Sequence, residues 1–89
     1  MSTRSVLRAE AMERAGGRCE WPGCNTTDWL EMAHIYPIGM GGRKTADTIS
    51  NVWMLCKPDH DHFDGRSPQR QREYRNLAAA YVAAKYGYR

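Results

Sequence analysis

The sequence predicts a small α+β domain in which two short strands and a metal-bound framework lie between a helix at each end of the chain. Three observations support this fold class. The 89 residues are too few for a large core without a metal, disulfides or a partner. Cysteines flank two short apolar segments, and both terminal segments have helical patterns. We expect one domain over residues 1–89, with its core motif at about 19–65.

The N-terminal segment, residues 2–15, has apolar residues at helical spacing and ends at Gly16-Gly17. The C-terminal helix is expected over residues 67–86, with Ser67 as its cap and Gly87 at its end. Its apolar face is predicted to comprise Tyr74, Leu77, Ala78, Tyr81, Val82 and Tyr86. Its arginines are expected mostly off that face: Arg70, Arg72 and Arg75.

Between these helices, the sequence predicts an antiparallel hairpin. The segment Trp29–Ile35 is dense enough in apolar residues for one strand, and residues 52–55 form a second candidate. A loop with Pro37 and three glycines joins them. The stretch KPDHDHFDG then reads as a short helix that ends at Gly65.

Composition narrows the setting of the chain. The net charge is +3, with ten arginines and three lysines, which permits nucleic acid as a partner but does not demand it. Three cysteines cannot all pair within one chain. No secretory leader pattern or membrane-length apolar run is present, so we expect a reducing, cytoplasmic setting and no membrane partner. Without a C-x-x-C pair, a redox role is not expected.

The cysteines have metal-ligand spacing. Cys19 and Cys24 lie either side of a Pro-Gly turn, and Cys56 is followed three residues later by Asp59. Each pair could supply two ligands to a tetrahedral zinc. His62 or a water is an alternative fourth ligand. The alternative interpretation is three buried cysteines without a metal.

Acidic residues and histidines gather in DHDHFDG, residues 59–65. His60 and Asp64 are four apart on the expected helix, so both could hold one divalent ion. If the strands pair, His34 lies close enough to act as a base in phosphodiester hydrolysis. Asn51 could hydrogen-bond backbone across the loop and hold His34 in place. Taken singly, these residues also fit a solvated loop, a packed ring and an ordinary turn.

At CEWPGC, LEMAHIYPIGMGGRK, SNVWMLCKPDH and DG, the chain resembles the HNH endonuclease family with its ββα-metal motif. The resemblance covers about half the chain, and GMGGRK is similar to HNH proteins of phages and prophages. It implies that His34 is the general base, that Asn51 orients the loop and the base, and that His60 binds the catalytic metal. It further implies a second ligand at Asp64 and a structural zinc at Cys19, Cys24 and Cys56.

Two residues depart from the family pattern. Ala33 stands where many members have a metal-binding histidine or aspartate before the base. Glu31, on the same strand face, is an alternative ligand if the strand end bends. Asp59 stands where the family usually has a fourth cysteine, so the zinc either accepts an oxygen ligand or is held more weakly.

The glycine-rich loop and the residues after the short helix are the expected nucleic-acid contacts. Gly39, Gly41 and Gly42 let the backbone approach a strand closely. The phosphate contacts are expected from Arg43, Lys44, Arg66 and Arg70, with Arg72 as a further member. Such contacts position a duplex without reading its sequence. For each, a mobile, solvated surface residue is the alternative. Trp21, Trp29, Trp53 and the helix tyrosines are expected in the core.

Three functions follow in order. The first is a DNA endonuclease of low sequence specificity that uses Mg²⁺, Mn²⁺, Ni²⁺ or Zn²⁺. The second is a zinc-stabilised module that binds DNA or a protein without chemistry. The third is a nuclease subunit that acts with a partner such as a phage packaging terminase, because so short a chain has little room for a sequence-reading element.

Overall fold

The computed structural model describes residues 3–36, 47–65 and 67–88. These residues form three α-helices around a two-stranded antiparallel sheet, so the predicted α+β class is confirmed. In chain order the elements are α1 (Thr3–Ala15), β1 (Leu30–His34), a 3₁₀ turn η2 (Ile49–Asn51), β2 (Val52–Cys56), α2 (Lys57–Asp64) and α3 (Pro68–Tyr86). None of the helices in the described ranges has the length and apolar character needed to cross a membrane.

The hairpin register sets which side chains share a face of the sheet. Ala33 pairs with Trp53, and Glu31 pairs with Leu55. Because successive residues of a strand alternate between faces, these four side chains lie on one side of the sheet. The predicted strands were nearly right: β1 excludes Trp29 and Ile35, and β2 extends to Cys56.

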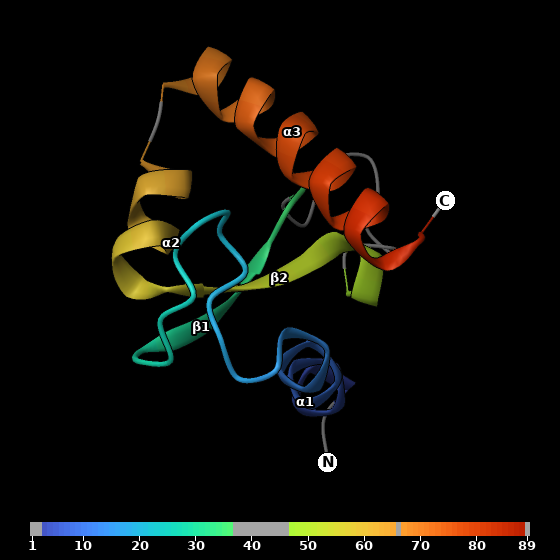
Figure 1. The fold of residues 1–89 in the computed structure, drawn as a ribbon. Coiled ribbons are helices and arrows are strands. Elements are labelled where there is room, and N and C mark those ends of the chain that lie inside the picture. Colours follow the sequence, from blue (N-terminus) through green and yellow to red (C-terminus); the bar gives the residue numbers. More distant parts are fainter. Residues whose placement is uncertain (1–2, 37–46, 66, 89) are drawn as a thin grey trace.

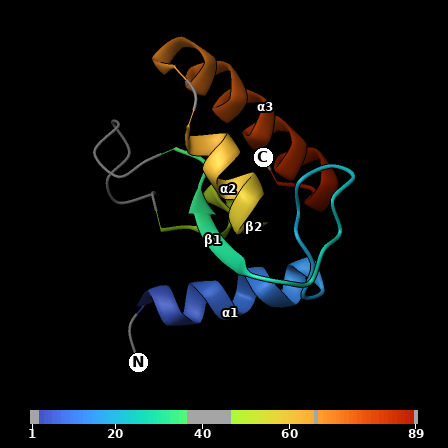
Figure 2. The same cartoon turned by 90° about the vertical axis from the view of Figure 1, so that its left-hand side faces the viewer.

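Helices cover both faces of the sheet, with α1 on one side and α2 and α3 on the other (Figures 1 and 2). On the α1 side, Leu7 and Ala11 pack against Val52 and Met54. On the other side, the buried cluster joins sheet residues to both later helices: Ala33, Trp53, Leu55, Phe63, Ala78 and Val82. This two-sided cover explains why every residue of β2 is buried.

Turn and cap residues position the connections. Pro22 and Gly23 form the tight turn between the first two cysteines, where Gly23 has a φ of 84° and the Cys24 amide donates to the Trp21 carbonyl. Ser67 caps α3 by accepting from the Arg70 amide, and Gly87 ends that helix with a φ of 75°. The predicted cap and end of this helix are therefore confirmed.

The buried face of α3 is rotated from the predicted one. Leu77 is 68% exposed, whereas Arg75 is only 8% exposed. Burial of Arg75 is possible because its guanidinium donates to the carbonyl oxygens of His34 and Ile35 and lies over the Phe63 ring. An arginine predicted to lie off the apolar face thus belongs to the helix–sheet interface.

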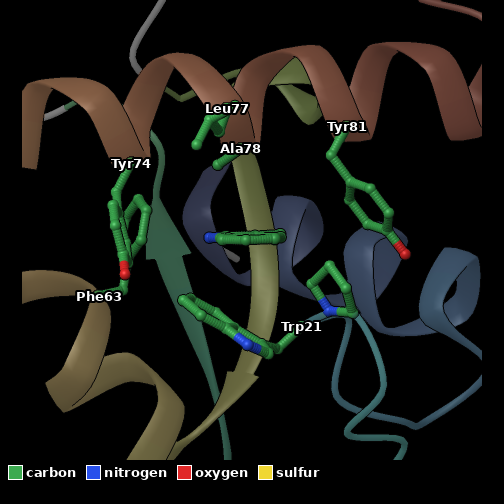
Figure 3. Close-up of a pocket in the computed structure, with 8 residues that line it drawn as sticks. Trp21, Phe63, Tyr74, Leu77, Ala78 and Tyr81 are labelled. Carbon is green, nitrogen blue, oxygen red and sulfur yellow. The ribbon is translucent and has the colours of Figure 1, made fainter.

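Most of the predicted core aromatics pack together under α3, around a pocket of about 380 Å³. Figure 3 shows Tyr74 and Tyr81 reaching down from α3, with Trp21 below and between them. Trp53 is 3% exposed, and its ring meets Phe63 edge-on with the ring centroids 5.4 Å apart. Trp29 contradicts the prediction because it is 78% exposed.

Candidate functional site

Three cysteines and one aspartate from distant parts of the sequence meet at one end of the sheet. The turn after α1 supplies Cys19 and Cys24, the end of β2 supplies Cys56, and the first turn of α2 supplies Asp59. One ligand atom from each lies within 4.8 Å of the other three. We call these four residues the thiol–carboxylate cluster. Among the described residues, no other group of three or more such side chains is this close.

The spacing within the thiol–carboxylate cluster fits a tetrahedral metal. The sulfurs of Cys24 and Cys56 are 3.8 Å apart. Two thiolates on one tetrahedral zinc, each at about 2.3 Å, are separated by about 3.8 Å. An Asp59 oxygen lies 3.3 Å from the Cys19 sulfur and 3.2 Å from the Cys56 sulfur. The predicted set of four residues therefore converges, and its donors suit zinc.

The environment of the thiols favours a compensating cation. Burial raises the pKa of Cys19 to about 12, and burial also raises the pKa of Cys56. Burial alone would raise the pKa of Asp59, but hydrogen bonds from the three thiols lower it overall. Metal ligation requires thiolates, so ion binding at this cluster must release protons.

His62, the alternative fourth ligand, is not a member of the thiol–carboxylate cluster. Its ring instead lies edge-on to Trp21, with centroids 5.6 Å apart, and 6.0 Å from Tyr74. Asp59 occupies the fourth position because it stands one helical turn closer to Cys56.

His34 ends β1 and pairs with an aspartate that the sequence analysis missed. Its Nε2 lies 2.7 Å from Oδ1 of Asp47, and the Oδ2 atom of Asp47 accepts from Arg4 of α1 at 3.2 Å. The hydrogen bond from His34 and the charge of Arg4 hold the pKa of Asp47 below its usual value. An ionised carboxylate only accepts, so Nε2 of His34 is the donor, and in the neutral ring Nδ1 keeps its lone pair.

Asn51 makes the contact expected of it. Its side chain donates to the Tyr36 carbonyl and accepts from the Tyr36 amide, both at 3.0 Å, and its own carbonyl accepts from Ile35. These bonds tie the chain just after His34 to the start of β2. Asn51 therefore holds the two residues after His34, Ile35 and Tyr36, against the start of β2.

His60 lies between two carboxylates. Its Nδ1 is 2.7 Å from Oε1 of Glu31 on β1, and its Nε2 is 3.0 Å from Oδ2 of Asp64 on the next turn of α2. The hairpin register directs Glu31 toward α2, which explains the first contact. Glu31 thus contacts Nδ1 of His60, while Asp64 faces Nε2 on the other side of the ring.

The spacing of His60 and Asp64 suits a hard divalent ion. Two ligands at right angles on an octahedral ion, each at about 2.1 Å, are about 3.0 Å apart. The nitrogen and the oxygen have this separation, and both side chains are partly exposed at 24% and 49%. Such an ion would have room for water and substrate oxygens.

Arg75 connects the histidine of β1 to the acid of α2. One of its nitrogens donates to the carbonyls of His34 and Ile35, at 3.2 and 2.6 Å, and the other donates to Oδ1 of Asp64 at 3.3 Å. Because Arg75 binds Oδ1 of Asp64, the other oxygen, Oδ2, faces His60. A single buried guanidinium therefore ties the backbone at the end of β1 to the Asp64 carboxylate.

Most of the predicted phosphate contacts lie outside the described residues: Gly39, Gly41, Gly42, Arg43, Lys44 and Arg66. Arg70 and Arg72 lie in the first turns of α3, and both are exposed.

Two site residues gave weak sequence signals. Asp47 stands in an unremarkable TADT context, and Arg75 stands in a helix with other arginines. The only clue to the burial of Arg75 was its helical spacing from Ala78 and Val82, which share the buried face of α3. Comparisons with protein-family models, with curated proteins and with solved structures find no match to this chain.

Proposed function

We propose that this chain is a metal-dependent endonuclease that hydrolyses phosphodiester bonds in DNA, with the ββα-metal site of the HNH type. The observation that carries the proposal is the link through Arg75, because it ties the backbone of a potential base, His34, to the carboxylate of a potential metal ligand, Asp64. Neither a packed histidine nor a solvated acidic loop needs such a link. The resemblance of the sequence to HNH endonucleases supports the same function.

In this proposal His34 is the general base. Asp47 accepts a hydrogen bond from Nε2–H and holds this neutral tautomer of the ring, so the lone pair of Nδ1 can take a proton from water. At 20% side-chain exposure, His34 is open enough to reach a water yet held by its partner. Asn51 keeps the adjoining backbone in place through Tyr36.

His60 and Asp64 hold the divalent ion, with Glu31 as the support of His60. The ion would polarise the scissile phosphate and stabilise the leaving 3′ oxygen. Glu31 accepts from Nδ1 of His60, so Nε2 presents its lone pair beside Asp64. A carboxylate behind a ligating histidine commonly orients the ring and raises its basicity.

The thiol–carboxylate cluster has a structural part in the proposal. Zinc there would join the turn after α1, the end of β2 and the start of α2, and therefore hold the helix that carries His60. Arg43, Lys44, Arg66 and Arg70 remain the proposed phosphate contacts, because they are basic residues that follow His34 and Asp64 in the sequence.

Ala33 supports a second candidate function. This residue is 1% exposed and offers no ligand at the position before His34, so the proposed ion has two protein ligands. Such a site would suit a nuclease subunit that acts with a partner, such as a phage packaging terminase, or a module that binds without chemistry.

A supercoiled-plasmid assay tests the proposal in Mg²⁺, Mn²⁺, Ni²⁺, Zn²⁺ or chelator. We expect wild type to nick with a divalent ion, and His34→Ala or His60→Ala to be slower by about 100-fold or more. His62→Ala is the matched control, because His62 lies on the same helix and is exposed. Equal cutting by wild type and His34→Ala would overturn the proposal. No cutting by any folded, zinc-loaded variant would favour the binding function.

A further inference from the structure

Trp29 is an aromatic side chain that the fold turns outward. It is 78% exposed although it immediately precedes β1. Its backbone has a φ of 56°, and its carbonyl accepts from the Lys57 amide at 3.0 Å. The hydrogen bond ties the start of β1 to the start of α2, so the backbone beneath the exposed ring is fixed. No described residue makes a ring contact with this indole.

A surface cavity of about 590 Å³ lies beside Trp29. Its lining comes from the loop before β1, the end of β2 and α2: Thr26, Asp28, Trp29, Cys56, Lys57, Pro58 and Asp61. We call this the Trp29 cavity. Its size is within the range of pockets that hold a small ligand or a side chain.

The Trp29 cavity is acidic in a basic chain. Two carboxylates and one ammonium line it, whereas the net charge of the chain is +3. The Lys57 ammonium is engaged by Asp61 at 3.4 Å. Within the described ranges, no cation pairs with Asp28. The local field therefore favours an incoming cation and opposes an incoming phosphate.

We propose that the Trp29 cavity binds an arginine side chain of a partner protein. A guanidinium can stack on the indole face while its N–H groups reach carboxylates. Arginine suits this better than lysine because its charge is planar and more weakly hydrated. The partner would dock at Asp28, Trp29 and Asp61. This inference stands whether or not the chain is a nuclease.

The test uses a peptide probe, Ac-Ala-Arg-Ala-Arg-Ala-NH₂, and its citrulline analogue, which keeps the shape and removes the charge. Each is titrated into the zinc-loaded, ¹⁵N-labelled full chain, and amide and indole shifts are followed. We expect shifts at the Trp29 indole N–H and at the amides of Asp28 and Asp61. The citrulline peptide should bind about threefold to fivefold more weakly or not measurably.

Variants separate the cavity from general charge attraction. Trp29→Gly removes the ring and suits the positive φ, and it should abolish the peptide-induced shifts at the Asp28 and Asp61 amides. Asp28→Asn with Asp61→Asn keeps the backbone and should weaken binding at least threefold. Leu77→Ala, which removes an exposed apolar side chain of α3, should bind as wild type does. Equal binding of the citrulline peptide, or unaltered binding by both cavity variants, would overturn the proposal. Shifts at Trp29 with a thymidine oligonucleotide but not with the peptide would also overturn it.

Discussion

The carboxylate of Glu31 lies 2.7 Å from one ring nitrogen of His60, while the carboxylate of Asp64 lies 3.0 Å from the other. Glu31 is on β1 and His60 is on α2, so this contact crosses the strand–helix boundary. A carboxylate that accepts from Nδ1 of a histidine orients the ring so that Nε2 can bind a metal ion. Glu31 therefore acts on the proposed metal through His60.

Glu31→Gln should weaken divalent metal binding by about tenfold, because a neutral amide supports the His60 ring less well than a carboxylate. The measurement is the nicking rate as a function of Mn²⁺ concentration, with isothermal titration of Mn²⁺ as a second readout. Excess Mn²⁺ should restore most of the rate. Glu13→Gln, an exposed glutamate on α1, is the matched control. An unchanged Mn²⁺ dependence in Glu31→Gln would contradict this role.

Asp47→Asn should lower the nicking rate at least about tenfold at saturating metal, because it loosens the tautomer and orientation of His34. Asp47 serves as an acceptor throughout the neutral range, since the hydrogen bond from His34 and the charge of Arg4 keep its pKa low. DNA affinity and thermal stability should change little. Single-turnover nicking and a binding titration in Ca²⁺ separate these quantities.

Arg4→Ala is the control for that prediction. Arg4 contacts the other oxygen of Asp47, but its side chain is 53% exposed, and exposed ion pairs contribute little. The variant should keep the contact between His34 and Asp47 and nick at nearly the wild-type rate. If Asp47→Asn were as active as Arg4→Ala, Asp47 would have no part in positioning the base.

Features with a local cause in the chain were predictable from the sequence. Ser67 and Gly87 bound α3 because a cap hydrogen bond and a left-handed residue act within one turn. The four members of the thiol–carboxylate cluster were found from spacing, because a tight turn and a strand–helix junction leave few ways for them to point.

The missed features depend on contacts between distant elements. Arg75 is buried because β1 ends with two carbonyls that need donors, and nothing near position 75 in the sequence shows this. Trp29 is exposed because its positive φ and its bond to Lys57 turn the ring outward, against the apolar pattern around it. Hydrophobicity alone could not distinguish that ring from the buried Trp53.

Asp59→Cys should tighten zinc binding by about tenfold or more, because zinc prefers a thiolate to a carboxylate and the position already faces the other ligands. Competition with a chromophoric chelator measures the zinc affinity. Asp59→Ala should weaken it, whereas Asp61→Ala, two residues along the same helix, should leave it unchanged. If Asp59→Cys and Asp59→Ala held zinc equally, residue 59 would not be a ligand.

A buried polar network centred on Glu20 joins α1, β2 and α3. The Glu20 carboxylate is nearly inaccessible and accepts from Arg14 at 2.8 Å, from the Met54 amide at 2.8 Å and from the Tyr86 hydroxyl. Burial and the hydrogen bond to Glu20 raise the pKa of Tyr86 above its usual value. The folded chain therefore keeps the Tyr86 proton to a higher pH than the unfolded chain does.

This retention makes the contribution of Tyr86 to stability depend on alkaline pH. The contribution is complete below the unfolded pKa of about 10 and is lost as the pH rises toward the raised folded pKa. Tyr86→Phe should cost of order 1 kcal/mol in the free energy of unfolding at pH 8. The gap between wild type and variant should shrink at pH 10.5 and pH 11. Urea unfolding of both zinc-loaded proteins at each pH measures this difference in the free energy of unfolding. A gap that stays constant from pH 8 to pH 11 would show that the hydrogen bond to Glu20 does not hold the Tyr86 proton.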